Sequence, residues 1–366
     1  MRRTLSRIST VLAAGGMLAA GLATTAATAA TASAATAPTW HRLLSVPNNP
    51  VSSPYDGTYV RFDAVVATGR TTGWAFRSDS TVAYERTGPT SWKGVAFPGG
   101  TGTVEAAAAT SPSSVWAAYD FSGGAQVDHW NGSRWTVVKS FSAAVTGITA
   151  LGANDVWVYG GVRGDGTGVW HYNGRTWTEV SGTLQGGSAL SDGNVWAYDY
   201  TSDTVDHFNG RTWTAMSVAN LLPPPPQIRP AQVTGVIALS PSNVYATAIT
   251  SYIPNLGGPL ELLHYNGHGW TKVTTSTFGG SREQRIVPDG NGGLWLADAA
   301  SAGGQAAVLH YSGGRLTEVP IPATASLPVL PFSLSLIPGT GGLLVGGVQY
   351  ASADGTKTNS VVEQYS

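Results

Sequence analysis

Acidic, basic and tyrosine side chains recur in the variable segments of this chain, where together they could bind a ligand. Carboxylates and guanidinium groups form strong hydrogen bonds with polar ligands, and tyrosine combines an apolar ring with a hydroxyl. The competing interpretation is that each is an ordinary solvated loop residue. We expect ligand binding to draw on Tyr119, Asp120, Arg163, Tyr198, Asp199, Tyr200, Arg229, Arg282 and Asp298.

Five of the seven histidines could suggest a metal site, because imidazole is a common metal ligand. They share one position of a repeated segment, and strands about 4.8 Å apart would place equivalent atoms of neighbouring repeats roughly 15 Å from each other. A zinc ion needs its nitrogen ligands at about 2 Å. No glycine-rich loop shows the spaced oxygens of a calcium site. We therefore predict a structural role for His129, His171, His207, His264 and His310, no obligatory metal and no cofactor.

All thirteen tryptophans lie inside repeats, which favours packing between repeats over a lectin that stacks one sugar per repeat. Arg163-Gly164-Asp165 spells an integrin-binding tripeptide. A match of three residues in a glycine-rich segment is more simply an ordinary turn.

A β-hairpin phrase organises the chain. WHYNGRTWTEV begins at Trp170, and related phrases begin at Tyr84, Asp128, Asp206, Leu263 and Leu309. Asn-Gly between aromatic and β-branched segments predicts a hairpin with a type I′ turn. A second phrase, such as GANDVWVYGG from Gly152, precedes each hairpin and predicts a tight turn that enters a strand.

The second phrase occurs seven times, with its apolar markers 39 to 50 residues apart. For one unit we expect strands at 145–151, 156–160, 169–172 and 176–180. Four strands at this period predict an all-β, seven-bladed β-propeller made of antiparallel blades. We call the strands of each blade A to D, from the centre outwards. The marker residues are Trp74, Trp116, Trp157, Trp196, Tyr245, Trp295 and Leu344.

The chain ends indicate how the ring closes. Residues 361–366 align with a strand C that stops where its Asn-Gly turn should be, and residues 39–44 match the missing strand D. We predict that they pair, so that 35–366 form one domain. The proline-rich 221–230 would then be an insertion between blades rather than an interdomain linker.

The first 34 residues have the features of a signal peptide. Arg2, Arg3 and Arg7 precede an apolar run, and Ala32-Ser33-Ala34 fits a cleavage site. The Sec or twin-arginine route stays open. Removal leaves 17 basic and 21 acidic side chains, a net charge of −4, which disfavours nucleic acid as a partner. With these signal-peptide features and no other apolar run of membrane-spanning length, we expect a secreted, extracellular protein. Because the chain has no cysteine, disulfides cannot stabilise it.

The phrases SPSSVWAAYD and DHWNGSRW resemble those of the secreted β-propeller repeat proteins of high-GC Gram-positive bacteria. The resemblance covers residues 38–366 and implies the fold and export. Kelch-like and Asp-box propellers are similar more distantly. The Asp of an Asp-box is replaced here by Tyr172 or Phe208, which argues against sialidase-type chemistry.

In such a blade the A–B and C–D turns share one rim, and the B–C and D–A loops share the other. The variable segments all belong to the second rim, where we expect the binding site. The favoured function is non-enzymatic recognition of an extracellular ligand, carbohydrate or another cell-envelope component. The alternatives are a propeller-type glycosidase or polysaccharide lyase, and a scaffold for a secreted protein partner.

Overall fold

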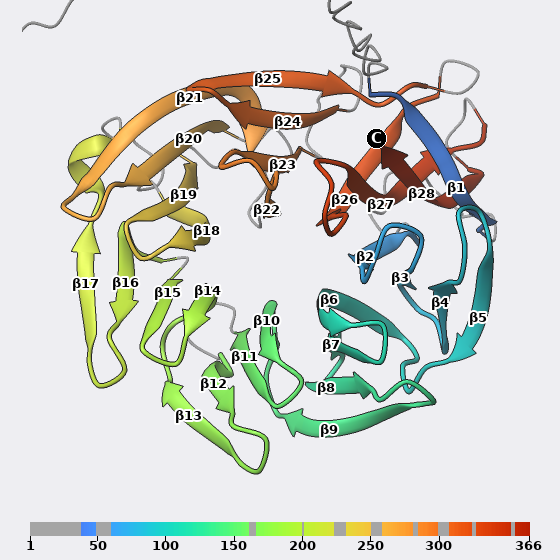
Figure 1. Cartoon of the computed structure of the whole chain (residues 1–366), viewed down its shortest axis with the longest axis horizontal. Helices are drawn as coiled ribbons and strands as arrows, with labels where there is room; N and C mark the ends of the chain where they lie inside the picture. Colours follow the sequence, from blue (N-terminus) through green and yellow to red (C-terminus); the bar gives the residue numbers. More distant parts are fainter. Residues whose placement is uncertain are drawn as a thin grey trace, which may run out of the picture. The chain divides into compact units, whose positions relative to one another are not determined.

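The repeats form seven four-stranded antiparallel sheets in the computed structural model (Figure 1). The structure describes residues 38–48, 60–160, 166–199, 201–222, 232–249, 258–280, 285–298, 307–323, 327–352 and 356–366. Contacts group Pro38–Ser366 into one compact unit. Among the described residues, no helix has the length and apolarity needed to cross a membrane.

Each of blades 1 to 6 is a meander whose strands follow one another along the chain. Blade 1 contains β2 (Phe62–Ala67), β3 (Gly73–Arg77), β4 (Val82–Arg86) and β5 (Trp92–Ala96). Blade 2 contains β6 (Gly102–Ser111), β7 (Ser114–Phe121), β8 (Gly124–Trp130) and β9 (Trp135–Phe141). Blade 3 contains β10 (Gly147–Gly152), β11 (Asp155–Gly160), β12 (Gly168–Tyr172) and β13 (Trp177–Ser181).

Blade 4 contains β14 (Gly186–Ser191), β15 (Asn194–Tyr198), β16 (Thr204–Phe208) and β17 (Trp213–Ser217), followed by the short 3₁₀ helix η1 (Ala219–Leu221). Blade 5 contains β18 (Gln232–Ser240), β19 (Asn243–Ile249), β20 (Gly258–Tyr265) and β21 (Trp270–Gly280). Blade 6 contains β22 (Ile286–Pro288), β23 (Leu294–Asp298), β24 (Ala307–Ser312) and β25 (Arg315–Pro320). Residues 223–231, most of the proline-rich stretch, lie outside the described residues.

Blade 7 joins the two ends of the propeller, as the sequence predicts. Its strands are β26 (Val329–Leu336), β27 (Leu343–Tyr350), β28 (Thr358–Tyr365) and, outermost, β1 (Trp40–Pro47). Trp40 pairs with Tyr365 in the antiparallel β1–β28 ladder. The inner strands contact one another in order from β2 to β26, and β26 contacts β2, so the ring is closed (Figure 1).

The Asn-Gly hairpins are present, but the predicted type I′ turn is wrong. Tyr172 pairs with Trp177, so residues 173–176 form a four-residue loop. Gly174 has φ +87°, whereas Asn173 is not at positive φ. The Asn173 Oδ1 accepts hydrogen bonds from the N–H groups of Arg175 and Thr176 at 3.0 and 2.9 Å. The asparagine side chain therefore shapes the turn, and only the glycine needs left-handed backbone.

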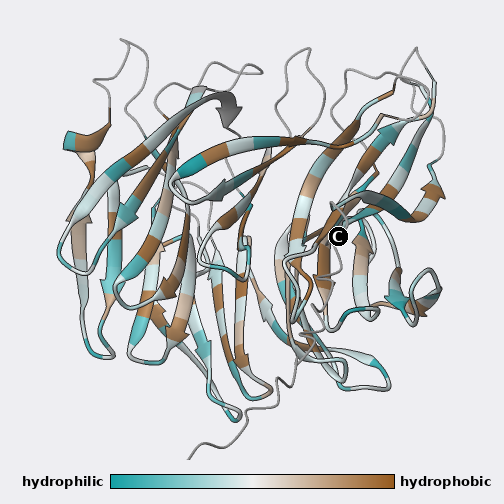
Figure 2. Cartoon of the chain, turned by 45° about the horizontal axis from the view of Figure 1, so that its top comes forward, coloured by the Kyte–Doolittle hydropathy of each residue, from teal (hydrophilic) through white to brown (hydrophobic). Residues whose placement is uncertain are grey.

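Aromatic side chains of strand B fill the space between blades. Trp74, Trp116, Trp157, Trp196 and Trp295 are at most 2% exposed. The ring of Trp74 in blade 1 lies 4.8 Å from that of Trp130 in blade 2, and Trp196 in blade 4 lies 5.0 Å from Tyr265 in blade 5. Figure 2 shows apolar residues along the strands and hydrophilic residues at many of the turns. Packing between blades is thus the observed role of the strand-B tryptophans.

The strand-C histidines connect the two repeated phrases. His171 pairs with Trp157 across β11 and β12, and the two rings stack with centroids 4.3 Å apart. The His171 Nε2 is hydrogen-bonded to Asp155 Oδ1 at 2.9 Å. In blades 2, 5 and 6 the corresponding partners are Ser114, Asn243 and Asp289. Burial lowers the pKa of His129, His207 and His264, which favours the neutral imidazole.

The closing blade allows a first test. Arg42 on β1 forms an ion pair of 2.6 Å with Glu363 on β28, and Glu363 is only 4% exposed. Arg42→Met leaves this carboxylate buried without its cation and should lower the free energy of unfolding by roughly 3 kcal/mol. Chemical denaturation would measure the loss. The double variant Arg42→Met/Glu363→Gln should recover part of it, and an equal loss in both variants would contradict the explanation.

A second test uses Asp128 on β8, which is 0% exposed and accepts hydrogen bonds from Gln126 Nε2. Burial, opposed by Gln126, raises the pKa of Asp128 to about 7. Because the folded chain holds this proton more tightly than the unfolded chain, the residue lowers stability progressively as pH rises from about 4 to 7. Asp128→Asn should be more stable than wild type at pH 8, by roughly 1–3 kcal/mol. Denaturation at pH 5 and pH 8 would measure it, and an unchanged pH profile would count against it.

Candidate functional site

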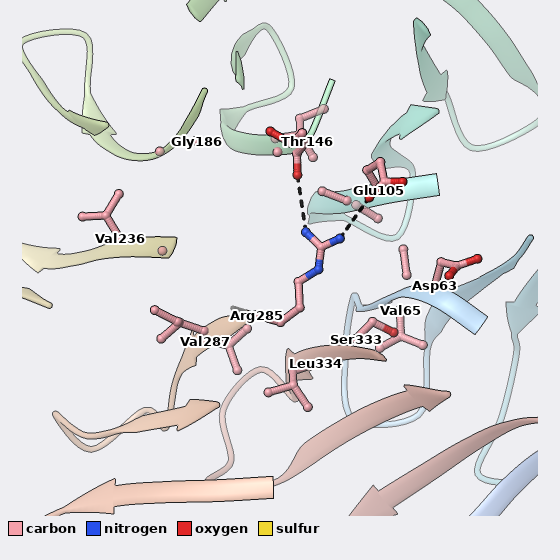
Figure 3. Close-up of a pocket in the computed structure, with 18 of the residues that line it drawn as sticks. Asp63, Val65, Glu105, Thr146, Gly186, Val236, Arg285, Val287, Ser333 and Leu334 are labelled. Atoms are coloured by element: carbon pink, nitrogen blue, oxygen red, sulfur yellow. Dashed lines mark hydrogen bonds and ion pairs between the residues drawn. The ribbon is translucent and has the colours of Figure 1, made fainter. Parts of the chain in front are cut away.

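The centre of the ring holds a cavity of about 220 Å³ (Figure 3). Every blade contributes an inner strand or the residue beside it to the lining. Most lining residues stand near the beginning of a strand A, where the D–A connection enters. The cavity therefore lies toward the rim of the B–C and D–A loops. Its polar side chains are Asp63, Glu105, Thr146, Tyr198, Arg285 and Ser333.

Arg285, which immediately precedes β22, connects blades that are far apart in the ring. Its Nη2 lies 3.2 Å from Glu105 Oε2 in blade 2, and its Nη1 lies 3.4 Å from the carbonyl oxygen of Thr146 beside blade 3. Figure 3 shows the guanidinium extending from blade 6 toward both partners. The side chains of Arg285 and Glu105 are 25% and 20% exposed. A partly hydrated cation and its counterion thus span the cavity.

Asp63 on β2 supplies a second carboxyl to the lining. It is 5% exposed, and its Oδ1 accepts a hydrogen bond of 2.5 Å from Arg61 Nε. Its Oδ2 has no hydrogen-bond partner among the described residues. Burial raises the pKa of Asp63, while Arg61, Ser78 and Arg285 oppose that rise. The Oδ2 atom is itself buried, so it does not face the open space of the cavity.

Hydrogen bonds to backbone carbonyls connect neighbouring blades around the cavity. The Thr146 Oγ1 donates to Gln185 O at 2.5 Å, and the Tyr198 hydroxyl donates to Thr234 O at 2.9 Å. Ser333 Oγ donates to Phe62 O at 3.4 Å. Because these contacts join strands of different sheets, they hold the lining in place.

Most of the polar lining was missed from the sequence, although a signal exists. In blade 1, Val66 on strand A pairs with Trp74 on strand B, and Asp63 lies three residues before Val66. Glu105 lies in the same position in blade 2, three residues before Ala108, the partner of Trp116. At both positions the register of the strand pairing shifts. Thr146 stands at the same position in blade 3. A bulge there releases one residue from the ladder. An alignment of the strand-A sequences, anchored on the strand-B tryptophans, would show a polar residue at this position in blades 1, 2 and 3.

Of the predicted binding residues, Tyr198 lines the cavity, but its side chain is only 6% exposed and its hydroxyl is engaged with Thr234. Tyr119 is 5% exposed, lies outside the cavity lining and packs against Phe97 and Phe121. The structure therefore gives Tyr119 a packing role between blades.

The predicted aspartates are less central than Asp63. Asp120 lies on β7, is half-buried and is outside the lining. Asp199 follows β15, and its two oxygens accept hydrogen bonds from the N–H and hydroxyl of Thr201 at 2.8 Å each. Asp298 is the last residue of β23. Arg163, Tyr200, Arg229 and Arg282 lie outside the described residues.

No family model matches this chain, and no curated protein matches it in sequence. Solved structures share its fold. A streptogramin B lyase has a TM-score of 0.60 and 11% identity over 90% of this chain and 97% of its own. YCF48 bound to a D1 peptide has a TM-score of 0.56 and 10% identity, with coverages of 89% and 96%. The GH74 xyloglucanase from Xanthomonas campestris has a TM-score of 0.56 and 12% identity, over 88% of this chain and 56% of its own.

These neighbours show the β-propeller architecture of the chain. At such low identity they carry no residue roles to it, and they include both enzymes and a protein with a bound peptide. Fold and function are only loosely coupled in propellers.

The cross-cavity ion pair allows a third test. Arg285→Met removes the contacts from blade 6 to Glu105 and to Thr146 O, and should lower the free energy of unfolding by about 1 kcal/mol, since both charged partners are partly hydrated. Arg211→Met is the matched control, because Arg211 is exposed in a C–D turn of the opposite rim. Equal stabilities of the two variants in chemical denaturation would contradict a role of Arg285 in joining the blades.

Proposed function

We propose that this chain is a secreted binding protein that recognises carbohydrate or related cell-envelope material at the central cavity and its surrounding rim. The observation that carries the proposal is the charged, hydrogen-bonding lining of the cavity, contributed by separate blades. The signal-peptide features of residues 1–34 support export.

The charge arrangement favours a neutral ligand rich in hydroxyl groups. Glu105 and Asp63 are each paired with an arginine, so a charged ligand would have to displace an existing ion pair. A hydroxyl group can instead donate to a carboxylate oxygen and accept from a guanidinium.

The size of the cavity limits how much of such a ligand can enter. At about 220 Å³ it lies below the ~300–1,000 Å³ of pockets that enclose a drug-sized molecule. A single terminal unit of a glycan would occupy it, and the rest of the chain would lie along the rim. Recognition of chain ends follows from this arrangement.

Catalysis is the second candidate function. Asp63 is a buried carboxyl whose pKa is raised by burial, as in a general acid, and Glu105 lines the same cavity. Glycoside hydrolysis uses such a pair of carboxyl groups. We favour binding because both carboxyls are engaged with arginines.

The test is retention of the mature chain, residues 35–366, on insoluble polysaccharides and cell-wall preparations, with the supernatant assayed for released sugar. We expect retention without release, weakened at least tenfold by Glu105→Gln and by Arg285→Met. Arg211→Met on the opposite rim should bind like wild type.

Other results would point elsewhere. Released oligosaccharide would replace the binding proposal with the enzyme. Failure to be retained on every matrix would overturn carbohydrate recognition and leave capture of a secreted protein. Equal weakening by Arg211→Met would show that the cavity is not the binding site.

A further inference from the structure

The rim of A–B and C–D turns brings together three side chains that metal ions favour. His171 lies on β12 of blade 3, Asp155 begins β11 of the same blade, and Asp192 lies in the turn between β14 and β15 of blade 4. One ligand atom from each lies within 4.8 Å of the others. The group is separate from the central cavity, since none of the three lines it.

In this group one imidazole nitrogen lies within hydrogen-bond distance of two carboxylates. The His171 Nε2 lies 2.9 Å from Asp155 Oδ1 and 3.2 Å from Asp192 Oδ1. One imidazole nitrogen carries at most one proton, so it cannot give a full hydrogen bond to both carboxylates. Among the described residues, neither carboxylate has a lysine or arginine partner. Within the chain, the two carboxylates therefore compete for one hydrogen-bond donor.

A divalent ion in place of that proton would satisfy all three groups. Zn²⁺ binds histidine nitrogen and carboxylate oxygen at about 2.0–2.2 Å, which places neighbouring ligand atoms roughly 3.4 Å apart. The observed separations of 2.9 and 3.2 Å need only a small widening. Two carboxylates also balance the charge of the ion.

Other blades show which part of this arrangement is special. In blades 2 and 5 the strand-C histidine also has a hydrogen-bond partner two residues before the strand-B aromatic. These partners are the uncharged Ser114 and Asn243. The third ligand comes from the position four residues before that aromatic in the next blade. Blades 2 to 6 have Pro112, Ala153, Asp192, Pro241 and Asn291 there, so only blade 4 offers a carboxylate.

We propose that Asp155, His171 and Asp192 bind one Zn²⁺ ion that cross-links blades 3 and 4. The repeat already orients two of the ligands, because His171 stacks on Trp157 beside Asp155. The chain has no cysteine, so a metal ion is a cross-link available to it where a disulfide is not. This site amends the expectation that the strand-C histidines are purely structural. It is independent of the carbohydrate proposal, which concerns other residues.

Calorimetric titration of the exported, untagged protein with zinc chloride tests the site, together with thermal unfolding with and without zinc. We expect one ion per chain and a higher unfolding temperature with zinc. Magnesium and calcium, which prefer all-oxygen ligands, should have no such effect. Asp192→Asn should weaken zinc binding at least tenfold, and it should fold normally because the Asp192 side chain is 66% exposed.

His171→Gln should weaken zinc binding similarly. His264→Gln is the matched control, because it changes the same strand position in blade 5 and should leave the affinity unchanged. The proposal is overturned if wild type binds no zinc, if Asp192→Asn binds it as wild type does, or if magnesium stabilises the chain equally.

Discussion

The structure depends on aromatic packing between neighbouring sheets. A four-stranded blade cannot bury both of its faces alone, and here a strand-B aromatic of one blade meets the residue before the hairpin turn of the next. Trp116 lies 5.8 Å from Tyr172, Tyr245 lies 5.6 Å from Tyr311, and Trp295 lies 5.5 Å from Tyr365. The strand-C histidine of the same blade stacks on this ring, as His310 does on Trp295 at 3.9 Å. One repeated aromatic thus connects its own blade and the next.

The junction between blades 7 and 1 is the exception. Leu344 takes the place of the strand-B aromatic, and Arg86 takes the place of the aromatic before the hairpin turn. Arg86 is 3% exposed and burial lowers its pKa, so this junction is the least apolar of the seven at that position. The chain ends meet inside blade 7, in the β1–β28 ladder and the Arg42–Glu363 ion pair. Blade 1 is joined to blade 7 by contacts of β2 with β26 and β27 and by the hydrogen bond from Ser333 Oγ to Phe62 O.

The two rims have different chemistry because of this construction. Short turns at one rim repeat from blade to blade, so a single change such as Asp192 places a second carboxylate beside a repeated histidine. The other rim surrounds the central cavity, where bulges in strand A place Asp63 and Glu105, and Arg285 joins blades that are distant in the sequence. The repeated residues build the blades, and residues that differ between repeats give each rim its own polar groups.

The number of blades, the four strands of each blade and the closing pair β1 and β28 are predictable from the amino-acid sequence, because they follow from a repeated local pattern. The sequence did not determine the turn geometry, since Asn173 uses its side chain where a type I′ turn would need positive φ. The composition of the cavity lining depends on how the blades close into a ring. Glu105 and Arg285 are 180 residues apart and meet through ring closure, which no local pattern encodes. The sequence predicts a ligand-binding role for Tyr119, but packing against Phe97, which follows β5 of blade 1, buries its ring.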